Sequence, residues 1–193
     1  MNIYGKHMEN CNKSKKNEGI IMMKRIMCAV LALVMLLSVG IAAAEEEAEE
    51  KIVIGVDLDG NEVTEDILVG AKLTIINVWG TFCGPCINEM PYLGQLAEEY
   101  ADRGVRIIGI VCDVDGSMPA DGAKSVVEAT GANYTHLLFN ELLYYCFICQ
   151  SDYIPITWLL DENGQLLESE PRIGSMSYEG WKELIDTYLA TAK

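Results

Sequence analysis

The sequence predicts one α/β domain with a central mixed β-sheet flanked by helices, extending from residue 52 towards the C-terminus. Two apolar runs, residues 73–79 and 105–112, are typical of buried strands and lie on either side of a helical segment. The strands of such a strand-helix-strand unit are parallel, with a right-handed crossover. Turn sequences at Asp59-Gly60-Asn61 and Asn163-Gly164 predict antiparallel hairpins near both ends of the domain, the first as an N-terminal β-hairpin extension.

The remaining elements follow from hydrophobic periodicity and from residues that favour turns and caps. We expect strands at 52–57, 62–64, 73–79, 105–112, 134–139, 156–160 and 165–168. We expect helices at 85–103, 123–130, 141–146 and 178–190, and a loop at 113–121. Pro91 should kink the first helix and Gly104 should end it, whereas Asn140 and Ser177 are predicted N-caps of later helices.

Charge and motif content exclude several functional classes. The 193 residues carry a formal net charge of −15, with 27 acidic and 8 basic side chains from Glu45 onward. Phosphate binding requires clustered Lys and Arg, so nucleic acid is not an expected partner. The chain has no phosphate-binding glycine loop or dinucleotide fingerprint, and no cofactor is expected. The one histidine after residue 44, His136, is predicted to be structural, and hydrolase chemistry has no support.

The N-terminal part carries the features of an export signal. Lys24 and Arg25 precede an apolar run at 26–41, and three alanines at 42–44 fit the cleavage pattern of a signal peptidase, with cleavage after Ala44. We predict a leader from a misassigned start at 1–22, a signal peptide at 23–44, an acidic linker at 45–51 and the domain at 52–193. The apolar run is shorter than the roughly 20 residues of a spanning helix, although an uncleaved anchor remains an alternative. The predicted location is extracytoplasmic, in the periplasm or at the outer face of the cell membrane.

The expected reactive centre is the pair Cys83 and Cys86, which follows a buried strand and opens a helix. Cys83 would lie at the helix N-terminus, where unpaired backbone N–H groups should lower its pKa below the free value of about 8.5. Cys86, one turn further, would act second by attacking the mixed disulfide between Cys83 and a substrate. Half of a zinc site has the same spacing, but the strand before the pair and the helix after it favour dithiol chemistry.

Three segments carry a resemblance to a known family: residues 79–86 (WGTFCGPC), 89–91 (EMP) and 154–157 (IPIT). Over residues 52–190 the chain resembles the exported TlpA/ResA-like disulfide reductases, which have the thioredoxin fold. The resemblance implies that Pro155 is a cis-proline beside the cysteine pair and that the backbone of Ile154 pairs with a substrate strand. It also implies oxidised exported proteins as substrates, an apocytochrome among them, and a membrane thiol-disulfide protein as electron donor.

The residues between and around the two cysteines qualify this resemblance. Gly84-Pro85 is similar to the dipeptide between the cysteines of the reducing members of the superfamily, which have reduction potentials of about −270 mV. This similarity favours reductase activity. Asn77 takes the place of the buried Asp that thioredoxin itself has as a proposed proton acceptor. Glu89, three residues past Cys86, could serve as that acceptor or could be a solvated helix residue, and both interpretations stay open.

Three further cysteines lie in the predicted domain. Cys112 is expected to be an inert buried thiol. Cys146 and Cys149 form a second pair, but helical residues at i and i+3 have Cβ atoms about 5–6 Å apart, wider than the roughly 3.5–4.5 Å of a disulfide. A bond would need the helix to end or distort near Cys149. The pair could be two core thiols, a structural disulfide, a second redox pair that exchanges with the first, or half of a four-cysteine zinc site.

The predicted function is therefore that of a monomeric, extracytoplasmic protein-disulfide oxidoreductase without a metal or cofactor. Two alternatives remain open. A thiol peroxidase of the same superfamily would use one cysteine against a peroxide, and a metal-binding or metal-delivery module would use both cysteine pairs as ligands.

Overall fold

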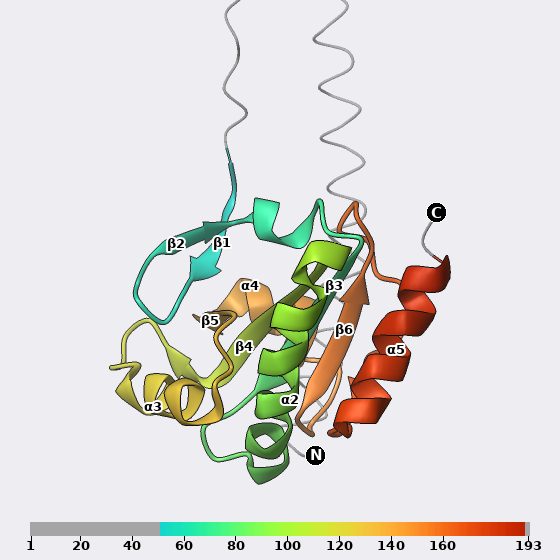
Figure 1. Ribbon diagram of the computed structural model, residues 1–193. Helices are drawn as coiled ribbons and strands as arrows, with labels where there is room; N and C mark the ends of the chain where they lie inside the picture. Colours follow the sequence, from blue (N-terminus) through green and yellow to red (C-terminus); the bar gives the residue numbers. More distant parts are fainter. Residues whose placement is uncertain (1–50, 192–193) are drawn as a thin grey trace, which may run out of the picture. The chain divides into compact units, whose positions relative to one another are not determined.

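A five-stranded mixed sheet is the core of the computed structural model, which describes residues 51–191 (Figure 1). The strand order is β5-β4-β3-β6-β7, with β3 parallel to β4 and antiparallel to β6. The five strands are β3 (Leu73–Trp79), β4 (Val105–Asp115), β5 (Thr135–Phe139), β6 (Ile156–Leu160) and β7 (Arg172–Ile173). All residues of β3 are buried, as its central position requires. The predicted mixed α/β sheet with a parallel strand-helix-strand unit is confirmed.

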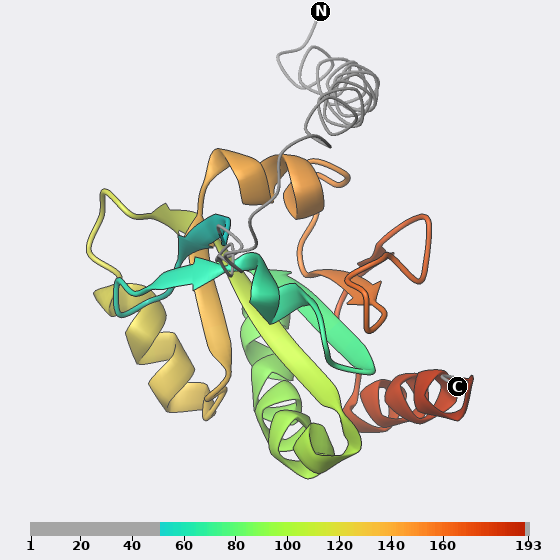
Figure 2. The same ribbon diagram turned by 90° about the horizontal axis from the view of Figure 1, so that it is seen from above.

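Three helices cover one face of the sheet, as the two views agree (Figures 1 and 2). They are α2 (Gly84–Tyr100), α3 (Asp121–Thr130) and α5 (Tyr178–Thr191). Side chains of α2 and α5 share an apolar cluster with Leu73 and Ile75 of β3. The apolar stripe of the last helix is therefore core, because Trp181 and Ile185 are completely buried in that cluster.

The opposite face is covered by shorter elements. The N-terminal hairpin consists of β1 (Val53–Val56) and β2 (Glu62–Thr64), which pair antiparallel as predicted. It is followed by the 3-10 helix η1 (Glu65–Leu68), whereas α4 (Glu141–Leu143) continues directly into a π-helical turn, η3 (Tyr144–Ile148). These elements share one apolar cluster with Ile76 and Val78, the β3 residues that point away from α2.

Three predicted helix ends, at Asn140, Ser177 and Gly104, are confirmed. Asn140 Oδ1 accepts a hydrogen bond from Leu143 N at 2.8 Å, and Ser177 Oγ accepts one from Gly180 N at 3.1 Å. Gly104 ends the short η2 (Ala101–Arg103) after α2, in the left-handed conformation that favours glycine. α2 continues through Pro91 as one helix, and a kink there stays a prediction.

Two of the predicted strands differ from the structure. β4 continues to Asp115, three residues beyond the expected end, and its register with β5 shifts after Val111. Residues 165–168 are not a strand: only an isolated bridge joins Leu166 to Leu160, and β7 pairs with β6 instead. Leu166 stays 49% exposed, so no buried face fixes that arm in register.

The predicted leader, the signal peptide and residues 45–50 of the acidic linker lie outside the described residues. Within residues 51–191, no helix has the length and apolar character needed to span a membrane.

Candidate redox site

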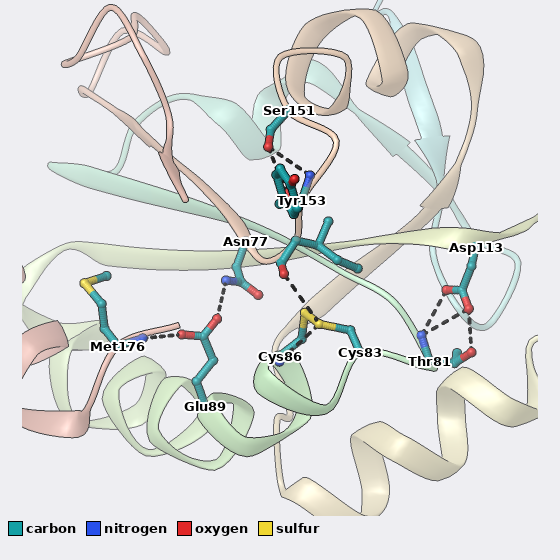
Figure 3. The surroundings of a disulfide bond; sticks show 10 residues. Asn77, Thr81, Cys83, Cys86, Glu89, Asp113, Ser151, Tyr153 and Met176 are labelled. Atoms are coloured by element: carbon teal, nitrogen blue, oxygen red, sulfur yellow. Dashed lines mark hydrogen bonds between the residues drawn. A yellow bond between two sulfur atoms is a disulfide. The ribbon is translucent and has the colours of Figure 1, made fainter. Parts of the chain in front are cut away.

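Cys83 and Cys86 form a disulfide at the N-terminus of α2, with their Cα atoms 5.3 Å apart (Figure 3). Cys83 is the N-cap residue of the helix, and Pro85 occupies its first turn, where a missing N–H group costs no hydrogen bond. The backbone N–H of Cys86 donates to Cys83 Sγ at 3.3 Å. Cys83 is 6% exposed and Cys86 is completely buried, so Cys83 is the sulfur nearer to solvent.

The segment before β6 lies directly against the disulfide. The Ile154–Pro155 peptide bond is cis, as the resemblance implied. The carbonyl oxygen of Ile154 lies 3.8 Å from Cys83 Sγ. Phe82 and Tyr153, which precede Cys83 and Ile154 in the sequence, are 74% and 75% exposed. The disulfide therefore lies under a surface with a backbone carbonyl and two exposed aromatic rings.

The loop between β3 and α2 is held by Asp113, a residue that was predicted to lie in a loop and had no predicted role. Its carboxylate accepts hydrogen bonds from Thr81 N at 3.0 Å and from Thr81 Oγ1 (Figure 3). The available signal was the pairing of β3 with β4, because parallel neighbours end at the same edge of a sheet. Asp113 thereby fixes the residue two positions before Cys83.

His136 is hydrogen-bonded to Trp79, the last residue of β3 before the same loop. Trp79 Nε1 donates to His136 Nδ1 at 3.0 Å, and His136 Nε2 lies 2.9 Å from the carbonyl oxygen of Ala132, to which it can donate. Burial lowers the pKa of His136 to about 4, so the ring is neutral at physiological pH. The predicted structural role of this histidine is consistent with these contacts.

Glu89 is a buried carboxylate, and its interpretation as a solvated helix residue is wrong. It is 1% exposed, with Oε1 accepting from Asn77 Nδ2 at 3.0 Å. Its Oε2 accepts from Met176 N at 2.9 Å and from Trp181 Nε1 at 3.2 Å. Burial raises the pKa of Glu89 above its ordinary value, and these hydrogen bonds oppose the rise. A carboxylate of this kind can exchange a proton closer to neutral pH than a surface Glu.

The other cysteines lie elsewhere in the fold. Cys112 is half-buried and not fully buried as expected, but burial, and secondly Asp113, raises the pKa of its thiol to about 11. This thiol is therefore protonated at neutral pH and a poor nucleophile.

Cys146 and Cys149 do not form a uniform pair. Cys149 is buried at the end of η3, whereas Cys146 is exposed, so the interpretation as two core thiols is wrong. The helix is distorted in this segment, because η3 is a π-helical turn. Between residues 51 and 191, no three metal-ligating side chains come together, and the four-cysteine zinc site is not assembled there.

The fold and the site define a thioredoxin-like domain, and the chain belongs to the Redoxin family, whose model matches residues 43–171. Among known proteins, the chain is similar to the thiol-disulfide oxidoreductase ResA of Geobacillus kaustophilus, with 26% identity over 93% of this chain and 99% of that protein. It is also similar to ResA of Bacillus anthracis, with 42% identity over 57 residues, which are 30% of this chain and 32% of the relative. In that higher-identity match the chain spans about a third of the relative's length.

Solved structures show the same fold. A thiol:disulfide interchange protein of the thioredoxin family from Chlorobium tepidum has a TM-score of 0.60 at 24% identity, covering 72% of this chain and 93% of that one. The thioredoxin domain of a Bacteroides vulgatus thiol-disulfide oxidoreductase has a TM-score of 0.56 at 21% identity, covering 72% and 92%. The predicted thioredoxin-like fold is thus confirmed.

Proposed function

We propose that the protein is an extracytoplasmic thiol-disulfide oxidoreductase that reduces disulfides of exported proteins through Cys83 and Cys86. The observation that carries this proposal is the disulfide at the N-terminus of α2, beside the carbonyl of Ile154. The relatives named ResA support the reaction class. The direction of electron flow rests on Gly84-Pro85, and the location rests on the predicted signal peptide at 23–44.

The reaction would run in two exchanges. The Cys83 thiolate attacks one sulfur of the substrate disulfide, forming a mixed disulfide and releasing the first substrate thiolate. The Cys86 thiolate then attacks Cys83 Sγ, which closes the disulfide and releases the second substrate thiolate. Two electrons pass to the substrate, and a membrane thiol-disulfide protein would return two electrons to the pair. The order follows the burial of the sulfurs, because Cys86 is completely buried and Cys83 is not.

Two neighbouring groups would assist these steps. The Ile154 carbonyl, 3.8 Å from Cys83 Sγ, would pair with the backbone of a substrate strand and align its disulfide. Glu89, one helical turn beyond Cys86 and of raised pKa, would accept the proton that Cys86 loses before it attacks. The proposed substrates are oxidised exported proteins, and the proposed state of the enzyme is a monomer.

Covalent trapping tests this function. A Cys86→Ser variant keeps the first exchange but not the second, so mixed disulfides should accumulate on Cys83 and be identifiable by mass spectrometry. The matched Cys83→Ser variant should trap none at this site. If Cys86→Ser captures no protein through Cys83, while Cys146 or Cys149 captures one, Cys83 is not the nucleophile.

The Cys86→Ser variant also distinguishes the proposed reductase from the alternative, a thiol peroxidase. A peroxidase needs one cysteine for the attack on peroxide, whereas the proposed reductase needs both. Rapid peroxide turnover by Cys86→Ser would therefore favour the peroxidase over the proposed function. For the metal-binding alternative, stoichiometric zinc or copper in protein purified under reducing conditions would be the supporting result.

Location can be measured directly on the full chain. Fractionation of cells that express it, with mass spectrometry of the product, should recover a chain that begins at Glu45 in the extracytoplasmic fraction. A full-length product in the soluble cytoplasmic fraction would overturn the proposed location and leave the redox chemistry unaffected.

A further inference from the structure

A buried amide lies between Glu89 and the candidate redox pair. Asn77 is in β3, has no exposed surface, and donates through Nδ2 to Glu89 Oε1 at 3.0 Å. An ionised carboxylate only accepts hydrogen bonds, so this contact assigns Nδ2 to the Glu89 side of the amide. In Figure 3 the amide lies between the carboxylate and the disulfide, with Oδ1 on the side of the disulfide. The two ends of one amide therefore face the Glu89 carboxylate on one side and the disulfide on the other.

The oxygen end of this amide lacks a hydrogen bond. Asn77 Oδ1 is buried without a partner among the described residues. Buried carbonyl oxygens are rarely left in this state, because the loss of hydration costs free energy. The oxidised pair cannot supply the missing donor, since neither sulfur carries a hydrogen. The reduced Cys86 can, because its thiol is buried on the same helix as Glu89, one turn earlier.

We propose that Asn77 is a positioning residue that couples the ionisation of Cys86 to that of Glu89. When Glu89 is ionised, the amide presents Oδ1 to Cys86 and accepts a hydrogen bond from its thiol. When Glu89 is protonated, the amide turns over, Oδ1 accepts from the carboxylic acid, and Nδ2 donates to the Cys86 thiolate. The inference rests on the proposed function, because it concerns the step in which Cys86 attacks the mixed disulfide.

The proton balance of this coupling is simple. One proton leaves Cys86 Sγ and one is held by Glu89, so thiol plus carboxylate becomes thiolate plus carboxylic acid. The buried site carries one negative charge in both states, which avoids the cost of a second buried charge. Coupling of this kind is reciprocal: the thiolate on Cys86 favours protonated Glu89 as strongly as protonated Glu89 favours the thiolate.

The surroundings of Glu89 offer no stronger electrostatic partner. Among residues 51–191, the ion pairs involve other carboxylates, and no Lys or Arg pairs with Glu89. The other titratable side chain that interacts with it is Tyr134, whose pKa is raised by burial and secondly by the charge of Glu89. The remaining contacts of the carboxylate are hydrogen bonds from the neutral groups of Asn77, Met176 and Trp181.

Thr157 provides a matched control. It lies on β6 directly opposite Asn77 in the strand register, and its Oγ1 is also buried without a partner among the described residues. Glu89 accepts no hydrogen bond from Thr157. Thr157→Val removes a polar group from the same part of the core and leaves the Asn77 amide in the chain, and it should leave the pH profile of the reaction unchanged.

The experiment is a double-mutant cycle on the full exported chain. Insulin reduction is followed from about pH 5 to about pH 9 for the wild type, Asn77→Leu, Glu89→Gln and the double variant. Each single variant should slow turnover at neutral pH by about tenfold, the value of one hydrogen bond, and should lose the same step of the pH profile. The double variant should be no slower than the slower single variant.

Additive effects, with the double variant about a hundredfold slower than the wild type, would overturn the coupling. Equal slowing by Thr157→Val would also overturn it, because polarity of the core and not the amide would then be responsible. If Asn77→Leu does not fold, Asn77→Thr replaces it, since threonine suits a strand and is too short to span both groups. A wild-type protein that does not reduce insulin contradicts the proposed function, whereas an active wild type with additive variants contradicts the coupling alone.

Discussion

The two cysteine pairs of this domain share one spacing and differ in everything around them. Cys83 caps a helix of 17 residues, Cys86 lies in its first turn, and the two form a disulfide after a short loop that follows the fully buried β3. Cys146 and Cys149 lie at the end of a short helix that widens into a π-helical turn, and Cys146 is exposed whereas Cys149 is buried. The same two-residue spacing is therefore presented by two different local structures.

The largest expected effect is the difference in disulfide-reducing activity between a substitution in the first cysteine pair and one in the second. Cys83→Ser should abolish disulfide reduction, because it removes the thiol at the N-terminus of α2 that lies nearer to the surface. Cys146→Ser should keep insulin reduction within about twofold of the wild type, as for a substitution outside the reacting atoms. A loss of more than tenfold in Cys146→Ser would show that the second pair takes part in the reaction.

Burial of His136 near the first pair predicts that the free energy of unfolding depends on pH. His136 is neutral in the folded protein, because burial lowers its pKa from 6.5 to about 4. Between these values the unfolded chain binds the extra proton, so stability should fall as the pH drops from about 6.5 to about 4. The full effect is about 3 kcal/mol in the free energy of unfolding.

Urea denaturation at a series of pH values checks this expectation. The comparison is with His136→Asn, whose side-chain oxygen can take the place of Nδ1 as acceptor for Trp79 but does not titrate in this range. The difference in stability between wild type and variant should be constant above about pH 7 and should change steadily below it. Parallel curves throughout would show that His136 is not a buried neutral base.

The close packing of Gly109 against the His136 ring predicts the next largest effect on stability. A side chain at Gly109 of β4 would collide with the His136 ring, so Gly109→Ala must displace the acceptor of Trp79. We expect a loss of about 2 kcal/mol, as for overpacking of a core, measured by denaturation. Gly122→Ala in α3 is the matched control: its Cβ would meet nothing within 4 Å, and it should stabilise by about 0.5–1 kcal/mol.

The local chemistry of the chain predicted the setting of the first pair well. The apolar run of β3, the proline in the first turn of α2 and the caps at Asn140 and Ser177 depend on neighbouring residues, and each lies where expected. The arm at 165–168 was mispredicted because its alternation would suit a strand, while β7 takes the available edge of β6. Residues 165–168 alone do not show that a later strand will pair with β6.

The state of Glu89 could not be derived from its own segment. A glutamate at this position of an amphipathic helix is compatible with burial and with solvation. The decision comes from Met176 and Trp181, which are 87 and 92 residues away in sequence and donate to its carboxylate. Asp113 was missed for a similar reason, because its partner Thr81 lies 32 residues earlier on the neighbouring strand's loop.

The smallest expected effect tests whether burial of Glu89 costs stability. Its pKa is raised, so the folded protein holds the proton more tightly than the unfolded chain, and stability should decrease as the pH rises above the ordinary glutamate range. Glu89→Gln cannot ionise. Once the Asn77 amide has turned over, Oε1 of the new glutamine side chain can accept hydrogen bonds from Met176 N and Trp181 Nε1. The Nε2 group of the same glutamine can then donate to Asn77 Oδ1.

The melting temperature of Glu89→Gln should therefore exceed that of the wild type at neutral pH, and the difference should shrink towards pH 4.5 and below, where Glu89 is protonated. Glu98→Gln on the exposed side of the same helix is the matched control for the loss of one negative charge. A lower melting temperature for Glu89→Gln at every pH would mean that the ionised carboxylate, with its three accepted hydrogen bonds, stabilises the fold. In that case burial of Glu89 has no cost in stability, and its proposed role in proton transfer is not needed to explain why an acid is buried there.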